Sequence, residues 1–352
     1  MIDIVKNLYG RIGRPLNFME VCGTHTVAIF RHGIRSILPD GLKLLSGPGC
    51  PVCVTSIRDI DTAIAIARSD DAILTTFGDM MRVPGGKQSL MEVRAEGSHI
   101  RIVYSPLDSL KIAKDNPGKK VVFFSAGFET TAPSAAATVS EAERMGIPNF
   151  FLYSVHKVVP PALEALLLSD DVRIDGFILP GHVSTIIGTK PYQFISEKYS
   201  IPCAVTGFGA NDILGGIAML LKQTIEGKAS VEVEYKTVVK EEGNPKAVKF
   251  IEDVFEPSDS YWRGIGMIPG SGLKLRSSWK HRDAEKIFTL EVPNISEPKG
   301  CMCGLVLRGV KIPSECPLFA KVCNPDKPVG ACMVSSEGSC AAYYRYRGVL
   351  EG

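Results

Sequence analysis

Between about residues 40 and 225 the sequence repeats one pattern: a short apolar run, a glycine-rich loop and a stretch with helical spacing of its apolar residues. Near-continuous apolar runs of this length are typical of strands covered on both faces, as in parallel sheets. The pattern predicts the α/β class, with two lobes of mostly parallel sheets flanked by helices. Residues 231–239 partly alternate, which predicts a half-exposed strand. The buried strands are predicted at residues 42–46, 72–76, 100–104, 121–125, 150–154, 176–180 and 203–207.

The length of 352 residues favours two or three domains. We expect an N-terminal segment and first lobe over residues 1–104, a second lobe over 105–262 and a C-terminal unit over 263–352. Residues 105–118 are expected to connect the two lobes. From Gly264 onward the sequence is rich in glycine, proline and cysteine and has few apolar runs. This last unit is therefore expected to need a metal in order to fold stably.

The composition argues against several classes of protein. A formal net charge of +2 gives no reason to expect binding to nucleic acid or to an acidic membrane surface. The first twenty residues carry charges throughout, and no stretch approaches ~18 uninterrupted apolar residues, so we expect neither a signal peptide nor a membrane span. Neither a phosphate-binding P-loop nor a G-x-S-x-G hydrolase motif is present. We expect a cytoplasmic protein whose thiols stay reduced.

The ten cysteines fall in groups, which indicates metal or thiol chemistry because a chain of this size does not need disulfides to fold. Cys50 and Cys53 form a C-x-x-C unit between a strand and a helix, where free amides stabilise a thiolate. This pair predicts redox or ligand chemistry, against the alternatives of simple packing or half a zinc knuckle. Cys22 and His25 lie three residues apart in CGTHT and form either an iron or nucleophile site or part of the core.

Six cysteines lie between residues 301 and 340 and give the strongest metal signal in the chain. Four thiolates suit either zinc or an iron–sulfur cluster. Their spacing matches neither a ferredoxin nor a zinc ribbon, so the spacing alone leaves the kind of metal open. Cys332 is interpreted as a packing residue. The predicted ligands are Cys316, Cys323, Cys340 and either Cys301 or Cys303.

The loops that follow the predicted strands carry further polar candidates. Because ligands bind outside the carboxyl ends of parallel strands, we expect these side chains to converge on one cleft. Asp79 and Glu129 either take part in chemistry or anchor their loops. The candidates are Cys50, Cys53, Asp79, Glu129, His156 and His182.

With these motifs assembled, the chain resembles the HypD family of [NiFe]-hydrogenase maturation factors from end to end. The resemblance implies two similar α/β lobes that face a cleft, and a C-terminal unit that holds a [4Fe-4S] cluster. It also implies a partnership with a HypC-type chaperone and with a HypE-type donor of cyanide groups. It is carried by MEVCGTHT (19–26), SGPGCPVCVT (46–55), TFGDMMRVPG (76–85), AGFETTAP (126–133), LPGHVS (179–184), IPGSGL (268–273) and the cysteine-rich tail (301–344).

The resemblance implies a role for each candidate residue. Cys22 would hold, together with a cysteine of HypC, the iron that becomes the Fe(CN)2CO unit of the hydrogenase. His25 would lie in the immediate shell of that iron. Cys50 and Cys53 would be a redox-active pair between the iron and the cluster. The cluster ligands would be Cys316, Cys323, Cys340 and either Cys301 or Cys303.

The implied function is an assembly scaffold with redox activity rather than a conventional enzyme. Iron that carries cyanide and carbonyl is soft enough to favour thiolate ligands. One alternative is a free-standing iron–sulfur thiol/disulfide oxidoreductase, which would use Cys50 and Cys53 but would need neither Cys22 nor a partner. Another is a zinc-stapled interaction module without a redox role. The TGFGAND loop departs from the family pattern, because Gly209 and Ala210 replace an acidic residue and a proline.

Overall fold

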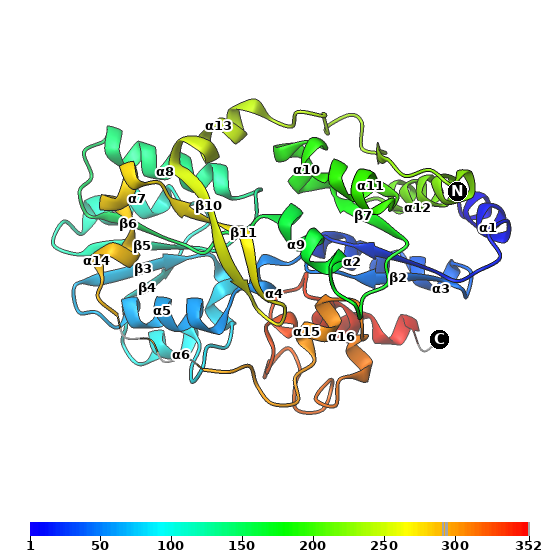
Figure 1. Ribbon diagram of the computed structural model, residues 1–352. Coiled ribbons are helices and arrows are strands. Elements are labelled where there is room, and N and C mark those ends of the chain that lie inside the picture. The colour runs from blue at the N-terminus through cyan, green and yellow to red at the C-terminus, as the bar shows by residue number, and fades with distance from the viewer. Residues whose placement is uncertain (291, 293–294, 351–352) are drawn as a thin grey trace.

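The computed structural model describes residues 1–290, 292 and 295–350 (Figure 1). Two parallel sheets lie beside each other with helices against their faces, and a C-terminal unit lies below them in the view of Figure 1. The predicted α/β class is therefore confirmed. Among the described residues, no helix is both long and apolar enough to cross a lipid bilayer.

The first sheet, called sheet A, has the strand order β2-β1-β7-β8-β9, and all of its strands are parallel. Strands β7 and β8 are buried along their whole length, as expected for strands with helices on both faces. The strands are β1 (Leu16–Glu20), β2 (Leu42–Ser46), β7 (Gly176–Pro180), β8 (Cys203–Thr206) and β9 (Val231–Val233). The helices of this lobe are α1 (Ile2–Gly10), α2 (Gly23–Arg31), α3 (Ile34–Ile37), α10 (Gly181–Ile187), α11 (Gln193–Tyr199) and α12 (Ala210–Glu226).

The second sheet, called sheet B, has the order β4-β3-β5-β6 and is also parallel throughout. Its strands β3 and β6 are fully buried, which explains their continuous apolar sequences. The strands are β3 (Ala72–Thr76), β4 (Ile100–Ile102), β5 (Lys120–Ser125) and β6 (Phe150–Ser154). The helices around it are α5 (Ile57–Ala67), α6 (Leu90–Ala95), α7 (Asp108–Asp115) and α8 (Ala132–Arg144). The helices α4 (Pro51–Val54) and α9 (Val159–Leu167) lie where the chain passes from one lobe to the other.

The strands of the two sheets interleave along the chain, since sheet A takes β1 and β2 and then β7 to β9, while sheet B takes β3 to β6. In each sheet the strand that comes first in the sequence lies in the interior. The second strand in the sequence pairs with one side of it, and the later strands lie on the other side. The two lobes therefore share one strand order. At such a reversal of strand order, α/β proteins form a crevice outside the carboxyl ends of the strands. The predicted domain boundaries themselves stay predictions.

Two segments differ from the sequence-based expectation. Residues 105–118 do not connect the lobes, because α7 lies here and joins β4 to β5 of the same sheet. Residues 231–239 form only the short strand β9, and the rest of this segment is turn and loop. The connection between the lobes instead follows β2 and again follows β6.

An antiparallel hairpin crosses the molecule between the two lobes (Figure 1). It is anchored to the segment after β6, because the Val158 N–H donates to the Ser271 carbonyl at 2.9 Å and the Leu273 N–H donates to the His156 carbonyl at 3.1 Å. Its second strand lies in a stretch that the sequence assigns to the C-terminal unit. The hairpin consists of β10 (Phe255–Trp262) and β11 (Gly266–Leu275) and follows α13 (Pro245–Val254).

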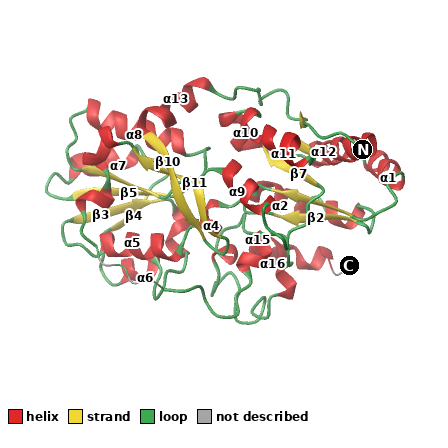
Figure 2. Ribbon diagram, viewed as in Figure 1, coloured by secondary structure: helices red, strands yellow, loops and turns green. Residues whose placement is uncertain are grey.

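The C-terminal unit consists mostly of loops and short helices (Figure 2). Its last helix packs on α2, where the Tyr343 ring meets the Phe30 ring edge-on at 4.7 Å. This contact brings the tail cysteines next to the N-terminal motifs. The helices are α14 (Ala284–Ile287), α15 (Cys303–Leu307) and α16 (Ser339–Leu350). The 3-10 helices of the chain are η1 (Gly78–Arg82), η2 (Lys190–Tyr192), η3 (Ser277–Arg282), η4 (Pro313–Glu315) and η5 (Ala331–Met333).

Candidate functional site

Cys22 and Cys50 follow two neighbouring parallel strands, β1 and β2, whose ends are paired through Glu20 and Ser46. Parallel strands end at the same edge of a sheet, so the two loops meet there. The Gly23 N–H donates to the Gly49 carbonyl at 3.0 Å. A Cβ on Gly49 would lie 2.5 Å from the Cα of Cys22, so only glycine permits this approach. The loop of Cys22 thus lies directly against the residue that precedes Cys50.

Cys22 precedes the first residue of α2 and is 8% exposed. Burial, with a smaller contribution from the Glu337 carboxylate, raises the pKa of the Cys22 thiol to about 11. The free thiol is therefore protonated at neutral pH. A metal ion replaces that proton when it binds, because thiolate is the form that ligates metals.

His25 is fully buried one turn further along α2. Its Nε2 lies 2.9 Å from the Gly207 carbonyl and 2.9 Å from the Thr206 hydroxyl. Since a carbonyl only accepts, Nε2 carries the proton, and burial lowers the pKa of His25 to about 4, so the ring is neutral. Its Nδ1 is buried and has no hydrogen-bond partner among the described residues. His25 therefore offers an open acceptor nitrogen within the Cys22 site.

The TGFGAND loop forms the opposite wall of this site. The ring of Phe208 lies between two imidazoles, 4.7 Å from that of His25 and 4.2 Å from that of His182. The Gly209 N–H donates to the Asp212 carboxylate at 3.0 Å, which caps α12. The acidic side chain of this loop thus has a helix-capping contact, and Phe208 is the part of the loop that contacts the two histidines.

Cys50 and Cys53 lie at the start of α4 with their Sγ atoms 2.6 Å apart. The Cys53 N–H donates to the Cys50 sulfur at 3.3 Å, which fixes the two side chains relative to each other. Cys53 is completely buried, and burial raises its pKa well above the usual range. On its far side Cys53 reaches the C-terminal unit, where its thiol contacts that of Cys332 and lies 3.9 Å from the Ala331 carbonyl. The pair therefore lies between the Cys22 loop and the tail.

Several tail thiols gather behind Cys53. The neighbouring thiols of Cys303 and Cys53 raise the pKa of the buried Cys332 thiol, and that of Cys340 acts in the opposite direction. The sulfurs of Cys303 and Cys301 lie 3.3 Å apart. Within the described part of the chain, no three His, Cys, Asp or Glu side chains already form one metal site. The all-thiol donor set nevertheless fits zinc or an iron–sulfur cluster.

Glycine makes room among these thiols. A Cβ on Gly330 would lie 2.7 Å from the Cys301 sulfur and closer still to that of Cys303. The backbone of Gly330 therefore forms one wall of a cradle that a larger residue would fill. This cradle and the thiol donor set are both consistent with a bound cluster at this place.

The remaining predicted ligands, Cys323 and Cys316, differ in their surroundings and in their exposure. The Cys323 sulfur accepts the Val329 N–H at 3.4 Å and lies near Cys301 and Cys303. Cys316 is partly exposed, and the contact its sulfur makes at 3.8 Å is with the Gly300 carbonyl. The structure thus groups the predicted ligands Cys301, Cys303, Cys323 and Cys340, with Cys332 added and Cys316 further out.

The polar residues predicted in the loops after the strands lie in different parts of the molecule. Asp79 is exposed and faces the C-terminal unit. Glu129 is buried, accepts the Val159 N–H at 2.8 Å, and burial raises its pKa to about 7, so it anchors its loop. His182 is exposed and packs on Phe208 beside the Cys22 site. The prediction of one common cleft for all six candidates is therefore wrong.

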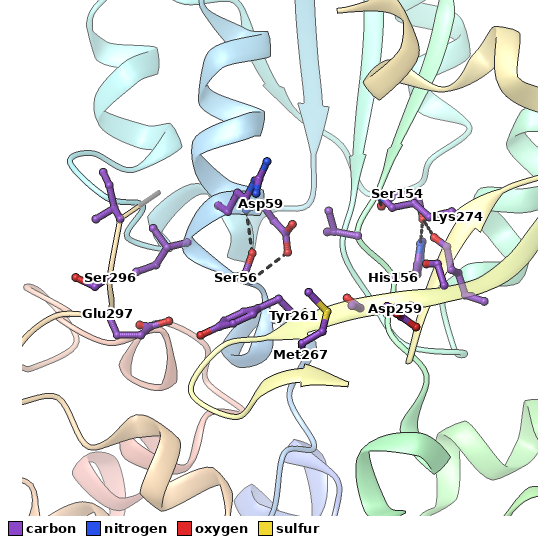
Figure 3. A pocket seen from close by; sticks show the side chains of 18 residues that line it. Ser56, Asp59, Ser154, His156, Asp259, Tyr261, Met267, Lys274, Ser296 and Glu297 are labelled. Atoms are coloured by element: carbon purple, nitrogen blue, oxygen red, sulfur yellow. Dashed lines mark hydrogen bonds between the residues drawn. The ribbon is translucent and has the colours of Figure 1, made fainter. Parts of the chain in front are cut away.

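His156 lines a separate cavity of about 660 Å³ between α5, the end of β6 and the hairpin (Figure 3). Its ring nitrogens lie 3.2 Å from the Thr131 hydroxyl and 3.4 Å from the Ser154 hydroxyl. Burial lowers its pKa to about 3, so the ring is neutral. Tyr261 and Glu297 lie across the cavity, and none of the described lining residues is a cysteine. His156 therefore belongs to a cavity that it shares with the hairpin and not with the cysteines.

Two carboxylates near Cys22 were missed by sequence reasoning. Glu20 is buried at the end of β1, accepts the Thr26 hydroxyl at 2.6 Å and lies 3.4 Å from the Cys22 N–H. Glu337 accepts the Thr24 hydroxyl at 2.7 Å and joins the tail to the Cys22 loop. For Glu20 the available signal was an acidic residue next to the apolar pair Phe18 and Met19, since an unpaired glutamate is almost never fully buried.

Comparisons with known proteins show the family of the chain. The family model HypD, described as "Hydrogenase formation hypA family", matches residues 1–347. The chain is 46% identical over 340 residues to hydrogenase maturation factor HypD of Rhodobacter capsulatus, covering 95% of this chain and 90% of that protein. It is 48% identical over 349 residues to a putative hydrogenase expression/formation protein of Methanocaldococcus jannaschii, covering 98% and 96%. Hydrogenase maturation factor HypD of Escherichia coli is 46% identical over 335 residues, covering 95% and 90%. The chain therefore belongs to the HypD family of hydrogenase maturation factors.

Proposed function

We propose that this chain is the scaffold on which the iron of a [NiFe]-hydrogenase receives its ligands. Cys22 and a cysteine of a HypC-type partner would hold the iron while cyanide from a HypE-type donor, and carbonyl, are added to make the Fe(CN)2CO unit. The observation that supports this proposal is an unbroken series of contacts from Cys22 through Gly49 to Cys50, from Cys50 to Cys53, and from Cys53 to the tail thiols.

Cys22 has the properties that a ligand for this iron needs. The iron is the substrate, and with cyanide and carbonyl bound it is soft enough to prefer a thiolate. The buried thiol is protonated and inert until iron displaces the proton. His25 stays neutral at physiological pH, and its Nδ1 can accept a hydrogen bond beside the iron without adding charge. Gly49 lets the loop before Cys50 pack directly against the Cys22 backbone, so the thiol pair lies next to the proposed iron ligand.

The tail thiols would hold a [4Fe-4S] cluster, with Cys301 or Cys303, Cys316, Cys323 and Cys340 as the proposed ligands. Such a cluster, when bound, supplies one-electron redox chemistry. Cys50 and Cys53 form a dithiol that releases two electrons and two protons when it closes to a disulfide. Because these thiols must stay reduced at rest, we place the protein in the cytoplasm.

Replacement of Cys22 by alanine tests the proposal. Cys22→Ala should abolish hydrogenase activity in cells that carry only this variant, because an iron ligand is lost. Its thermal unfolding should stay unchanged, because the thiol is not a core anchor. Cys203→Ala is the matched control, since Cys203 is an equally buried thiol of sheet A outside the thiol series, and it should keep maturation. Full hydrogenase activity with Cys22→Ala would instead favour a free-standing oxidoreductase that uses only Cys50 and Cys53.

A further inference from the structure

The strand β4 forms a free edge of sheet B, whose order is β4-β3-β5-β6. Successive residues of a strand point their backbone N–H and C=O groups to opposite sides. The His99 carbonyl accepts an N–H of β3 at 2.9 Å, and the Val103 N–H donates to a carbonyl of β3 at 3.0 Å. This alternation points the C=O group of Ile100 and both backbone groups of Ile102 away from β3. The edge therefore offers hydrogen-bonding groups to a further strand.

A groove of about 540 Å³ follows this edge and carries uncompensated positive charge. Arg94 and Arg101 are exposed, and neither is in an ion pair within the described part of the chain. The acidic residues of the adjoining segment are already engaged, because Glu92 caps α6 and Glu96 pairs with Arg68 at 3.0 Å. Among the described residues that line the groove, none is acidic. They are Arg94, Ser98, His99, Ile100, Arg101 and Ile102.

An apolar projection lies just beyond the end of the same strand. Tyr104 is 95% exposed, and Ile102 and Leu107 are 43% and 50% exposed. The loop that carries Tyr104 is held in place, since the N–H groups of Tyr104 and Ser105 donate to the Asp108 carboxylate at 3.2 and 2.9 Å. An exposed tyrosine on a held loop loses little conformational entropy when a partner covers it, and tyrosine often dominates binding at protein interfaces.

We infer that the β4 edge binds an extended acidic segment of a protein partner, which adds to sheet B as a further strand. Hydrogen bonds to the backbone of Ile102 would hold the segment, as in other cases of strand addition. Its carboxylates would pair with Arg94 and Arg101, and an apolar side chain would pack on Tyr104. A second copy of this chain fits the edge poorly, because two basic grooves would then face each other.

This surface goes beyond the proposed function. In Figure 1 the strand β4 belongs to the lobe of sheet B, whereas Cys22 follows β1 in the lobe of sheet A. A segment bound at β4 makes no use of the cysteines. The binding experiment and the test of Cys22 can therefore fail independently of each other.

A fluorescein-labelled peptide, in which glutamate alternates with valine around a central phenylalanine, tests the inference. Fluorescence anisotropy measures its binding to the full-length protein in dilute buffer, beside a matched peptide with lysine in place of each glutamate. We expect the acidic peptide to bind about tenfold or more tightly than the lysine peptide. Arg94→Glu/Arg101→Glu should weaken the acidic peptide about tenfold or more. Arg11→Glu changes an exposed arginine after α1 and should leave binding unchanged.

Ile102→Pro tests the strand addition itself. Proline removes the outward N–H of Ile102 and leaves the groups that pair with β3, so the sheet should persist while peptide binding falls severalfold. Thermal unfolding of this variant should match that of the wild type. If the variant unfolds at a lower temperature, Tyr104→Ala takes its place, because a side chain that is 95% exposed contributes little to the fold. Tyr104→Ala should weaken the acidic peptide severalfold.

Three results would overturn the inference. The first is equal binding of the acidic and lysine peptides, or no binding of either. The second is wild-type affinity for the acidic peptide in Arg94→Glu/Arg101→Glu, in a stably folded Ile102→Pro or in Tyr104→Ala. The third is a dimer of the wild type in sedimentation that Ile102→Pro converts to a monomer, since the edge would then belong to a second copy of this chain.

Discussion

Glu20 carries a buried carboxyl group next to the Cys22 site, and its ionisation should control stability. It is the last residue of β1, is completely buried and accepts the Thr26 hydroxyl at 2.6 Å. Burial raises its pKa from 4.5 to about 7, although hydrogen bonds from Thr26 and Ser46 act in the opposite direction. The folded protein therefore binds the proton of Glu20 more tightly than the unfolded chain does. This stabilisation is fully present below pH 4.5 and is lost as the pH rises towards 7.

The size of the effect follows from the shift. One pKa unit corresponds to about 1.4 kcal/mol, so the whole shift is worth about 3 kcal/mol, and about 2.5 kcal/mol of it falls between pH 5 and pH 8. Glu20→Gln removes the ionisation and keeps one acceptor oxygen for Thr26. Relative to the wild type, the free energy of unfolding of Glu20→Gln should therefore rise by about 2 to 3 kcal/mol from pH 5 to pH 8.

Urea unfolding followed by circular dichroism at several pH values, without oxygen and with reductant, measures this difference. Glu256→Gln changes an exposed glutamate on β10 and controls for the loss of one carboxylate. The test compares each variant with the wild type at the same pH, which cancels the contribution of Glu129, whose pKa burial also raises. A difference between Glu20→Gln and the wild type that is the same at pH 5 and pH 8 would refute the reasoning.

Two glycine substitutions test the contacts around the thiols. In Gly330→Ala the new Cβ would lie 2.7 Å from the Cys301 sulfur, so the iron bound per chain should fall severalfold. Metal analysis after anaerobic purification measures this loss. Gly118→Ala is the control, because its new Cβ would lie in open space and the variant should keep its iron. In Gly49→Ala the new Cβ would push on the Cys22 backbone, and hydrogenase activity in cells should fall about tenfold or more. Unchanged iron in the first variant or full activity in the second would contradict these assignments.

The buried strands could be predicted closely from the sequence. Residues 72–76, 150–154 and 176–180 are strands with the predicted bounds, because strands covered on both faces are continuous apolar runs. The edge strand at residues 42–46 also has the predicted bounds, although Lys43 is exposed. The strand β1 is missing from the predicted set, since LNFME contains an asparagine and a buried glutamate. The hairpin was missed because its exposed positions are filled by polar residues, glycine and proline. A continuous apolar run thus indicates a strand well, whereas strands with polar residues, glycine and proline at many positions leave a weaker local pattern.

The assignment of strands to sheets depends on contacts that a local pattern does not contain. Strands β1 and β7 are neighbours in sheet A although sheet B is built between them in the sequence. The contacts among the cysteines likewise depend on the fold and are not contained in the local sequence. The roles suggested for Cys50 and Cys53 come from their spacing, but the contact between Cys53 and Cys332 joins two residues on different units. For this reason Cys332 was interpreted as packing.

The shared strand order of the two lobes explains why the thiols meet on only one of them. Each sheet has a crevice where its strand order reverses, and Cys22 follows β1 at the crevice of sheet A. At the crevice of sheet B, Glu129 is bound to the Val159 N–H, and Phe128 is stacked on Trp262 of the hairpin at 5.7 Å. The hairpin therefore covers the second crevice with packed side chains. At the first crevice the tail packs on the Cys22 loop instead, because Glu337 accepts the Thr24 hydroxyl at 2.7 Å, so Cys22 lies where sheet A, the C-x-x-C pair and the tail meet.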